Sequence, residues 1–208
     1  SAFTKFLDNA IAYATEKQKY ARLTFDSQKS FFGVNELNIK QCLFKECITM
    51  KKRGGGGVLL ERPDGKITIN KSLFTDCHAA SSSGSGGAVS IVDGTAKLSI
   101  TECCFKDCSA TLTGQAIHVI GTNITGIIGD VQADNCPSVS ALLQACCLSL
   151  KSTVSIGILN ISNTRTAFCP AFRIKATPTI SIKYLLVDSC SVKRADCIAE
   201  IGDRKSVV

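Results

Sequence analysis

The stretch Leu37-Asn-Ile-Lys-Gln-Cys-Leu-Phe-Lys-Glu-Cys47 recurs twice along the chain, as Ile67-Thr-Ile-Asn-Lys-Ser-Leu-Phe-Thr-Asp-Cys77 and as Leu98-Ser-Ile-Thr-Glu-Cys-Cys-Phe-Lys-Asp-Cys108. Each copy has an aliphatic residue, an Ile two positions later, a polar step and then Phe-x-x-Cys. Self-similarity at a fixed period of 20 to 50 residues is the signature of stacked repeat architectures. This repeat therefore decides the fold.

Weaker copies extend the repeat toward the C-terminus. In each of them an aliphatic residue is followed seven positions later by another, in the pairs Ile124/Val131, Val154/Ile161 and Ile180/Val187. We therefore expect coils to start near residues 37, 67, 98, 124, 154 and 180, so that each coil holds 26 to 31 residues.

The strongest segments alternate between apolar and polar residues, which is the period of a half-buried strand. A coil of this length that climbs one strand spacing per turn, roughly 4.8 Å, places like residues above one another. The sequence thus predicts an all-β right-handed parallel β-helix of about six to seven coils over residues 37–208. Two internal ladders follow, one of aromatic rings and one of thiols: Phe44, Phe74 and Phe105, and Cys47, Cys77 and Cys108.

Residues 1–36 differ from the repeat. Six apolar residues near the N-terminus fall on one face at helical spacing, and they are Phe3, Phe6, Leu7, Ala10, Ile11 and Ala14. We expect a short amphipathic helix there that caps the open end of the stack, followed by an irregular first coil that includes Phe25 and Phe31.

The combination of Phe-x-x-Cys with Gly86-Gly87-Ala88-Val89 resembles the repeat of the polymorphic outer-membrane protein family, in which Gly-Gly-Ala-aliphatic is paired with Phe-x-x-Asn. A degenerate glycine copy stands at Gly56-Gly57-Val58-Leu59. Cys replaces the family's Asn, which resembles Cys-rich variants in surface proteins of some protists. The resemblance covers residues 37 to 120 well. It implies a surface-exposed β-helical module used for adhesion, but it does not indicate which ligand the module binds.

The thiol ladder has two interpretations that the sequence leaves open. Neighbouring ladder cysteines would be close enough for disulfides, but side chains stacked in register point the same way, which favours buried reduced thiols. No Cys-x-x-Cys occurs, and the two histidines, His78 and His118, lie in different coils. We therefore predict no metal site and no cofactor.

Enzymatic chemistry is the least favoured interpretation. A carbohydrate-active enzyme of the pectin lyase-like fold would need converging carboxylates with a basic side chain, whereas Asp76 and Asp107 occupy the turn position before a ladder Cys. The glycines near residues 54–57 and 84–87 recur at one place in the repeat, which indicates tight loops. The sequence therefore predicts no catalytic residues. It favours a surface module, with a structural component of a larger β-helical assembly as the alternative.

Composition limits the location and the partners. The formal charge is +7 over 208 residues, which is typical of a solvated basic surface, so we predict no nucleic-acid partner. No apolar run is long enough for a transmembrane helix. We expect an extracellular or cell-surface piece of a longer protein, whose partners are a protein or glycan on a cell surface or further β-helical copies. Asn70, Asn123 and Asn160 match the N-glycosylation pattern.

Overall fold

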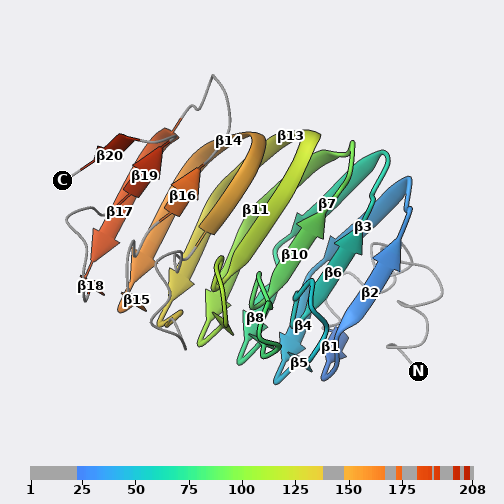
Figure 1. The fold of residues 1–208 in the computed structure, drawn as a ribbon, viewed down its shortest axis with the longest axis horizontal. Helices are drawn as coiled ribbons and strands as arrows, with labels where there is room; N and C mark the ends of the chain where they lie inside the picture. Colours follow the sequence, from blue (N-terminus) through green and yellow to red (C-terminus); the bar gives the residue numbers. More distant parts are fainter. Residues whose placement is uncertain are drawn as a thin grey trace.

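The computed structural model describes residues 23–137, 148–166, 172–174, 182–188, 190–192, 199–201 and 204–206. These residues form an all-β parallel solenoid of about five turns and contain no helix, against the six to seven coils expected for the whole chain. Its coils stack in order from β1 and β2 at one end to β19 and β20 at the other (Figure 1). The expected N-terminal helix lies outside the described residues.

Each coil contributes strands to three faces, which are joined by short corners. Face 1 contains β2 (Lys29–Phe32), β6 (Val58–Glu61), β10 (Val89–Val92), the first parts of β13 (Ile117–Asp134) and β14 (Leu148–Ser162), β16 (Phe172–Ile174) and β19 (Ala199–Ile201). Face 2 contains β3 (Glu36–Lys40), β7 (Lys66–Asn70), the first part of β11 (Lys97–Lys106), the middle of β13 and β14, and the start of β17 (Ile182–Asp188).

Face 3 contains β1 (Leu23–Phe25), β4 (Cys42–Lys45), β8 (Leu73–Thr75) and the last parts of β11, β13, β14 and β17. After face 3, the two-residue strands β5 (Ile48–Thr49), β9 (His78–Ala79) and β12 (Ser109–Ala110) pair with one another, as do β15 (Arg165–Thr166) and β18 (Ser191–Val192). All pairs are parallel except that of β20 (Arg204–Ser206) with β19. Within the part of the chain that the structure describes, no helix is long and apolar enough to span a membrane.

Single residues in the left-handed region turn the chain at the corners. The corner after face 3 is made by Glu46, Asp76, Asp107, Asn135 and Asn163, whose φ angles lie between +47° and +56°. Asp and Asn are the non-glycine residues that adopt this conformation most readily. The prediction that Asp76 and Asp107 are turn residues is confirmed.

The register corrects one predicted coil start. Leu37, Ile67 and Leu98 align as expected, but the next residue in this column is Gly126, two positions after Ile124. Thr125 pairs with Lys97, whose side chain points outward. Ile124 precedes Thr125 in the strand, so its side chain points inward and is fully buried. A shift of two residues preserves the inside–outside alternation, so apolar periodicity by itself could not distinguish the two starts.

The first coil is regular rather than irregular. Leu23 pairs with Cys42, and Phe25 pairs with Phe44, so that β1 continues face 3 in register. In the same way β2 pairs with β6 on face 1. Within the described residues, the solenoid therefore begins at Leu23, before the predicted boundary at residue 37.

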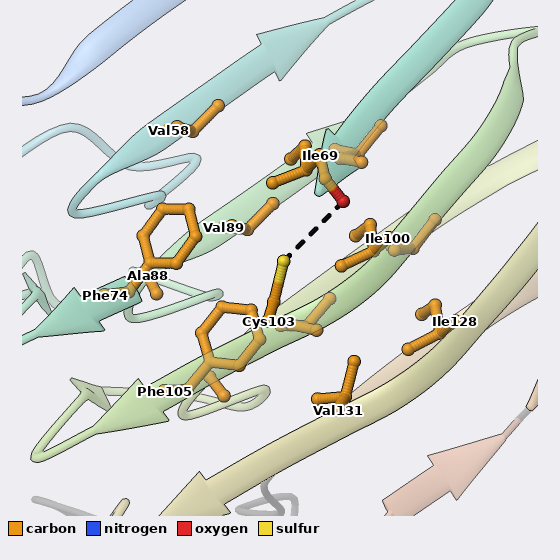
Figure 2. Packing of buried hydrophobic residues seen from close by; sticks show 14 of the residues in the cluster. Val58, Ile69, Phe74, Ala88, Val89, Ile100, Cys103, Phe105, Ile128 and Val131 are labelled. Carbon is orange, nitrogen blue, oxygen red and sulfur yellow. Dashed lines mark hydrogen bonds between the residues drawn. The ribbon is translucent and has the colours of Figure 1, made fainter. Parts of the chain in front are cut away.

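The phenylalanine ladder holds four rings, one more than the sequence predicts. The rings of Phe25, Phe44, Phe74 and Phe105 are fully buried and stacked, with successive centroids 4.7, 4.6 and 5.0 Å apart. In the next coil the column continues with the small side chain of Ala133. Aliphatic ladders pack beside the rings, and Figure 2 shows Ile69, Ile100 and Ile128 following one another from coil to coil.

The thiol ladder is also present and longer than predicted. The Sγ atoms of Cys47, Cys77, Cys108 and Cys136 lie 3.3 to 3.7 Å from the carbonyl oxygens of the phenylalanine ladder in the preceding coil. Each thiol donates to its carbonyl, and all four side chains are buried. That these thiols are reduced stays a prediction. Burial raises the pKa of the Cys108 thiol well above its ordinary value, so this thiol stays protonated and able to donate.

One position of this column holds a residue other than cysteine, and this leads to the first prediction. Thr164 stands in the coil after Cys136, is fully buried, and donates its hydroxyl to the Ser162 carbonyl at 3.0 Å. Cys108 has a matching acceptor in the Lys106 carbonyl at 3.3 Å. We therefore expect Cys108→Thr to change the free energy of unfolding in urea by less than about 1.5 kcal/mol, and the bulkier Cys108→Leu to cost about 1–3 kcal/mol. Equal losses for the two variants would contradict this account.

The glycine motif recurs in the preceding coil, but its copy there begins one residue earlier than the sequence predicts. Val89 pairs with Val58, so the copy of Gly86-Gly87-Ala88-Val89 is Gly55-Gly56-Gly57-Val58 and not residues 56–59. The first glycine of each copy has a positive φ, as does Gly114 one coil later. The second glycine, at 56 and 87, has no room for a side chain, because a Cβ there would lie within 2.3 Å of backbone oxygen from the next coil.

Candidate functional site

Two loops cover the outer surface of β6 and β10 on face 1. Loop 50–57 connects β5 to β6, and loop 80–88 connects β9 to β10. The loops are joined by backbone bonds, such as Gly55 N to Ser85 O at 3.1 Å, and the Ser90 hydroxyl on β10 donates to the Arg53 carbonyl at 2.7 Å. Both sides of β10 are consequently buried, which is unusual for a solenoid strand whose outer side normally faces solvent.

A pocket of about 280 Å³ opens where these loops meet face 1. It is lined by two basic residues of loop 50–57, two serines of loop 80–88, the end of β10 and two residues of β13: Lys52 and Arg53, Ser83 and Ser85, Val92 and Asp93, and His118 and Ile120. The pocket therefore combines side chains from three successive coils. The sequence does not reveal this grouping, because the lining residues are spread over residues 52 to 120.

The charges at the pocket are partly paired. Arg53 contacts the carboxylate of Asp93, and its Nε lies 3.5 Å from Glu61 on β6. Such half-exposed pairs contribute little to stability, but they hold the guanidinium in one place. No ion pair within the described residues involves Lys52, the second basic residue of the rim.

His118 forms the floor of the pocket and is 7% exposed. Its Nδ1 atom is buried and has no hydrogen-bond partner among the described residues. Burial lowers the pKa of His118 to about 4, and the nearby positive charge of Lys151 acts in the same direction. The imidazole is therefore neutral at pH 7. In the register of face 1, His118 stands in one column with Ser90 and Leu59.

This buried histidine predicts a dependence of stability on pH. The unfolded chain takes up a proton near pH 6.5, whereas the folded chain does so only near pH 4, so the unfolded state binds more protons between these values. The free energy of unfolding should therefore fall as the pH is lowered from 6.5 to 4, by up to about 3 kcal/mol. Urea unfolding at several pH values checks this. A His118→Leu variant should lose the slope in this window, and an unchanged slope would contradict the assignment.

The pocket offers hydrogen-bond donors. Among the residues that the structure describes, no group of three or more His, Cys, Asp or Glu side chains is placed to hold a metal ion. Asp93, the only carboxylate of the lining, is already bound to Arg53. The ammonium of Lys52 and the hydroxyl of Ser85 remain as donors around the neutral imidazole, whereas the Ser83 hydroxyl donates to the Lys52 carbonyl at 3.5 Å.

The sequence provided only parts of this site. The sequence predicts that loops 48–57 and 78–87 project from one side of the stack as a recognition edge, and the structure joins them by backbone hydrogen bonds. His118 could not be recognised, because a residue at its position in the strand points outward and would be exposed without the loops. His78 is elsewhere, with its Nδ1 2.8 Å from the Ser109 hydroxyl.

The glycosylation candidates lie apart from the pocket. Asn123 is exposed in β13, whereas Asn70 and Asn160 are half-buried in β7 and β14. The Asn70 amide donates to the Thr101 hydroxyl at 2.9 Å, and Ser72, the third residue of its pattern, is buried. Of the three, the position of Asn123 is the most accessible, and its modification stays a prediction.

Comparison with protein-family models, with curated protein sequences and with solved structures finds no match to this chain. The function is therefore inferred from the solenoid and from the geometry of the loop-lined pocket.

Proposed function

We propose that the chain is a non-enzymatic extracellular surface module that binds host or partner surfaces, as adhesins do. The observation that carries this proposal is the pocket at the junction of loops 50–57 and 80–88. Solenoids commonly bind partners through side chains gathered from adjacent repeats, and here the gathered groups are donors and not a catalytic set. The resemblance to the polymorphic outer-membrane protein repeat supports the same role.

The handedness of the solenoid is also part of what we propose. We infer that the coils wind in the right-handed sense, because roughly 98% of parallel strand crossovers do so. This corresponds to the right-handed, pectin lyase-like β-helix that the repeat predicts. Such a rod presents its loops along one side, where a surface ligand can reach them.

Binding to arrayed ligands tests the surface role. The labelled full chain is applied to arrays of glycans and of extracellular and cell-surface proteins, beside Lys52→Ala at the pocket and Lys66→Ala on the exposed outer side of β7. The wild type and Lys66→Ala should bind the same spots, and Lys52→Ala should lose most of the signal. Absence of binding to every spot, or equal binding by all three proteins, would overturn the proposal.

A structural role in a β-helical assembly is the second candidate, and a surface feature of the later coils favours it. Four large apolar side chains are exposed on the outer surface of faces 2 and 3 and the corner between them: Ile127, Ile158, Tyr184 and Leu186. In the earlier coils the column of Ile127 holds the polar residues Asn38, Thr68 and Ser99. Ile158 and Tyr184 are paired in neighbouring coils. Clustered exposed apolar side chains are typical of protein contacts.

Light scattering over a wide concentration range tests this second role. An assembly component should increase in mass with concentration, and Tyr184→Ser should shift it toward the monomer. A mass that stays monomeric throughout would exclude self-assembly through this surface.

A further inference from the structure

The pocket has more donors than acceptors. Lys52 and Ser85 supply donors, and the Asp93 carboxylate is already occupied by its contact with Arg53. Ser85 is largely buried, and no side-chain hydrogen bond of its hydroxyl is found within the described residues. A ligand that completes this pocket must therefore bring acceptor oxygens, preferably charged, because hydrogen bonds between a cation and an oxyanion are the strong ones.

The orphaned imidazole is an independent sign of a ligand site. An unpartnered polar atom in a buried position destabilises the folded state, and a functional role is one of the explanations for retaining it. The column of His118 shows that this cost is avoidable, because the equivalent residue two coils earlier is the buried Leu59. The chain thus has a polar side chain at a position where an earlier coil holds an aliphatic one.

The size and lining of the pocket restrict the ligand further. A volume of about 280 Å³ is at the lower end of the range for small-molecule sites. The pocket is therefore larger than a bare oxyanion, but it is not larger than one sugar ring with its substituent. Val92 and Ile120 add apolar surface, against which the C–H face of a ring can pack. The donors at the rim and the apolar surface of Val92 and Ile120 together suit a charged sugar.

We propose that this pocket binds a single monosaccharide unit bearing a sulfate or carboxylate group, with the oxyanion at Lys52 and Ser85 and the ring over Val92 and Ile120 beside His118. The inference rests on the proposed surface role and specifies its ligand as an acidic glycan. An oxyanion next to the imidazole also favours its protonated form, so binding should strengthen as the pH falls.

Chemical-shift titration of the full chain tests the ligand class. The probes are glucosamine 6-sulfate, glucuronic acid, neutral glucose and inorganic sulfate, with shifts followed at the backbone amides of residues 52–55, 83–85 and 118. The sulfated or carboxylated sugar should bind at least about tenfold more tightly than glucose and inorganic sulfate, with shifts confined to these amides. Equal affinity for glucose, or for the free ion, would overturn the inference, as would shifts elsewhere.

Matched variants test whether binding of the acidic sugar depends on the residues of the pocket. Lys52→Ala and Ser85→Ala should each weaken binding of the acidic sugar at least about fivefold, whereas Lys66→Ala, with the same charge change on face 2, should not. His118→Leu should remain folded, because Leu59 fills the same column, and should lose the strengthening of binding at low pH. Retained pH dependence in this variant would exclude the imidazole from the site.

The outcomes also separate this inference from the surface role. If the chain binds neutral glycans on the array through the pocket, with loss of signal in Lys52→Ala, the surface role is supported and the acidic-sugar inference fails. If the acidic sugar binds at the pocket while no array ligand does, the surface role fails and the ligand class is supported.

Discussion

Replacing Phe74 by alanine is expected to lower the free energy of unfolding by about 3–5 kcal/mol. Phe74 is fully buried and stacks on Phe44 at 4.6 Å and on Phe105 at 5.0 Å. It also faces Gly57 across the core, since a Cβ on that glycine would lie 3.0 Å from the ring. Alanine would leave a cavity in the middle of the ladder, where the strands above and below cannot collapse without breaking their own pairing. Urea unfolding followed by circular dichroism measures the loss.

Two variants control for this prediction. Phe32 is 68% exposed on β2, so Phe32→Ala should cost much less than the core substitution. Phe74→Leu keeps most of the volume and should lose about 1–1.5 kcal/mol, which makes the effect measurable even if the alanine variant does not fold. Comparable losses at positions 32 and 74 would show that the ring ladder does not stabilise the solenoid.

The second large effect is expected for Gly87→Ala. An added Cβ would lie 2.1 Å from the Gln115 carbonyl oxygen and 2.5 Å from that of Ser109. Both obstacles are backbone atoms of the next coil, so the substitution can be accommodated only if the coils separate. We expect a loss of at least about 3 kcal/mol or failure to fold, measured by soluble yield and by urea unfolding.

Gly129→Ala is the matched control. At Gly129 the nearest atom to an added Cβ is Ile127 Cδ1 at 3.6 Å, an ordinary contact, and the glycine is in a strand without a positive φ. Alanine there should leave the stability unchanged or raise it by about 0.4–1 kcal/mol, because it reduces the entropy of the unfolded chain. A severe loss at position 129, or none at position 87, would contradict the packing described for the two sites.

The repeat and the glycine loops were predictable because each coil must bury the same columns. Alternation identified the strands of the coils that begin at Leu37, Ile67 and Leu98, and like residues in equal phase predicted the ladders. Alternation failed to fix the fourth coil start, since Ile124 and Gly126 lie on the same side of one strand. The stacking of Phe25 was also missed, because the first coil lacks the full Phe-x-x-Cys motif.

The sequence by itself determined the parallel β-solenoid architecture and its interior, including Phe44, Phe74 and Phe105 and the thiols that stack beside them. Only the tertiary structure decided which outward residues are buried. His118 is outward by alternation, yet loops 50–57 and 80–88 close over face 1 and place it beneath Lys52 and Ser85. The physical reason is that repetition fixes which side of a strand a residue occupies, whereas the cover on that side depends on how loops of neighbouring coils pack on one another.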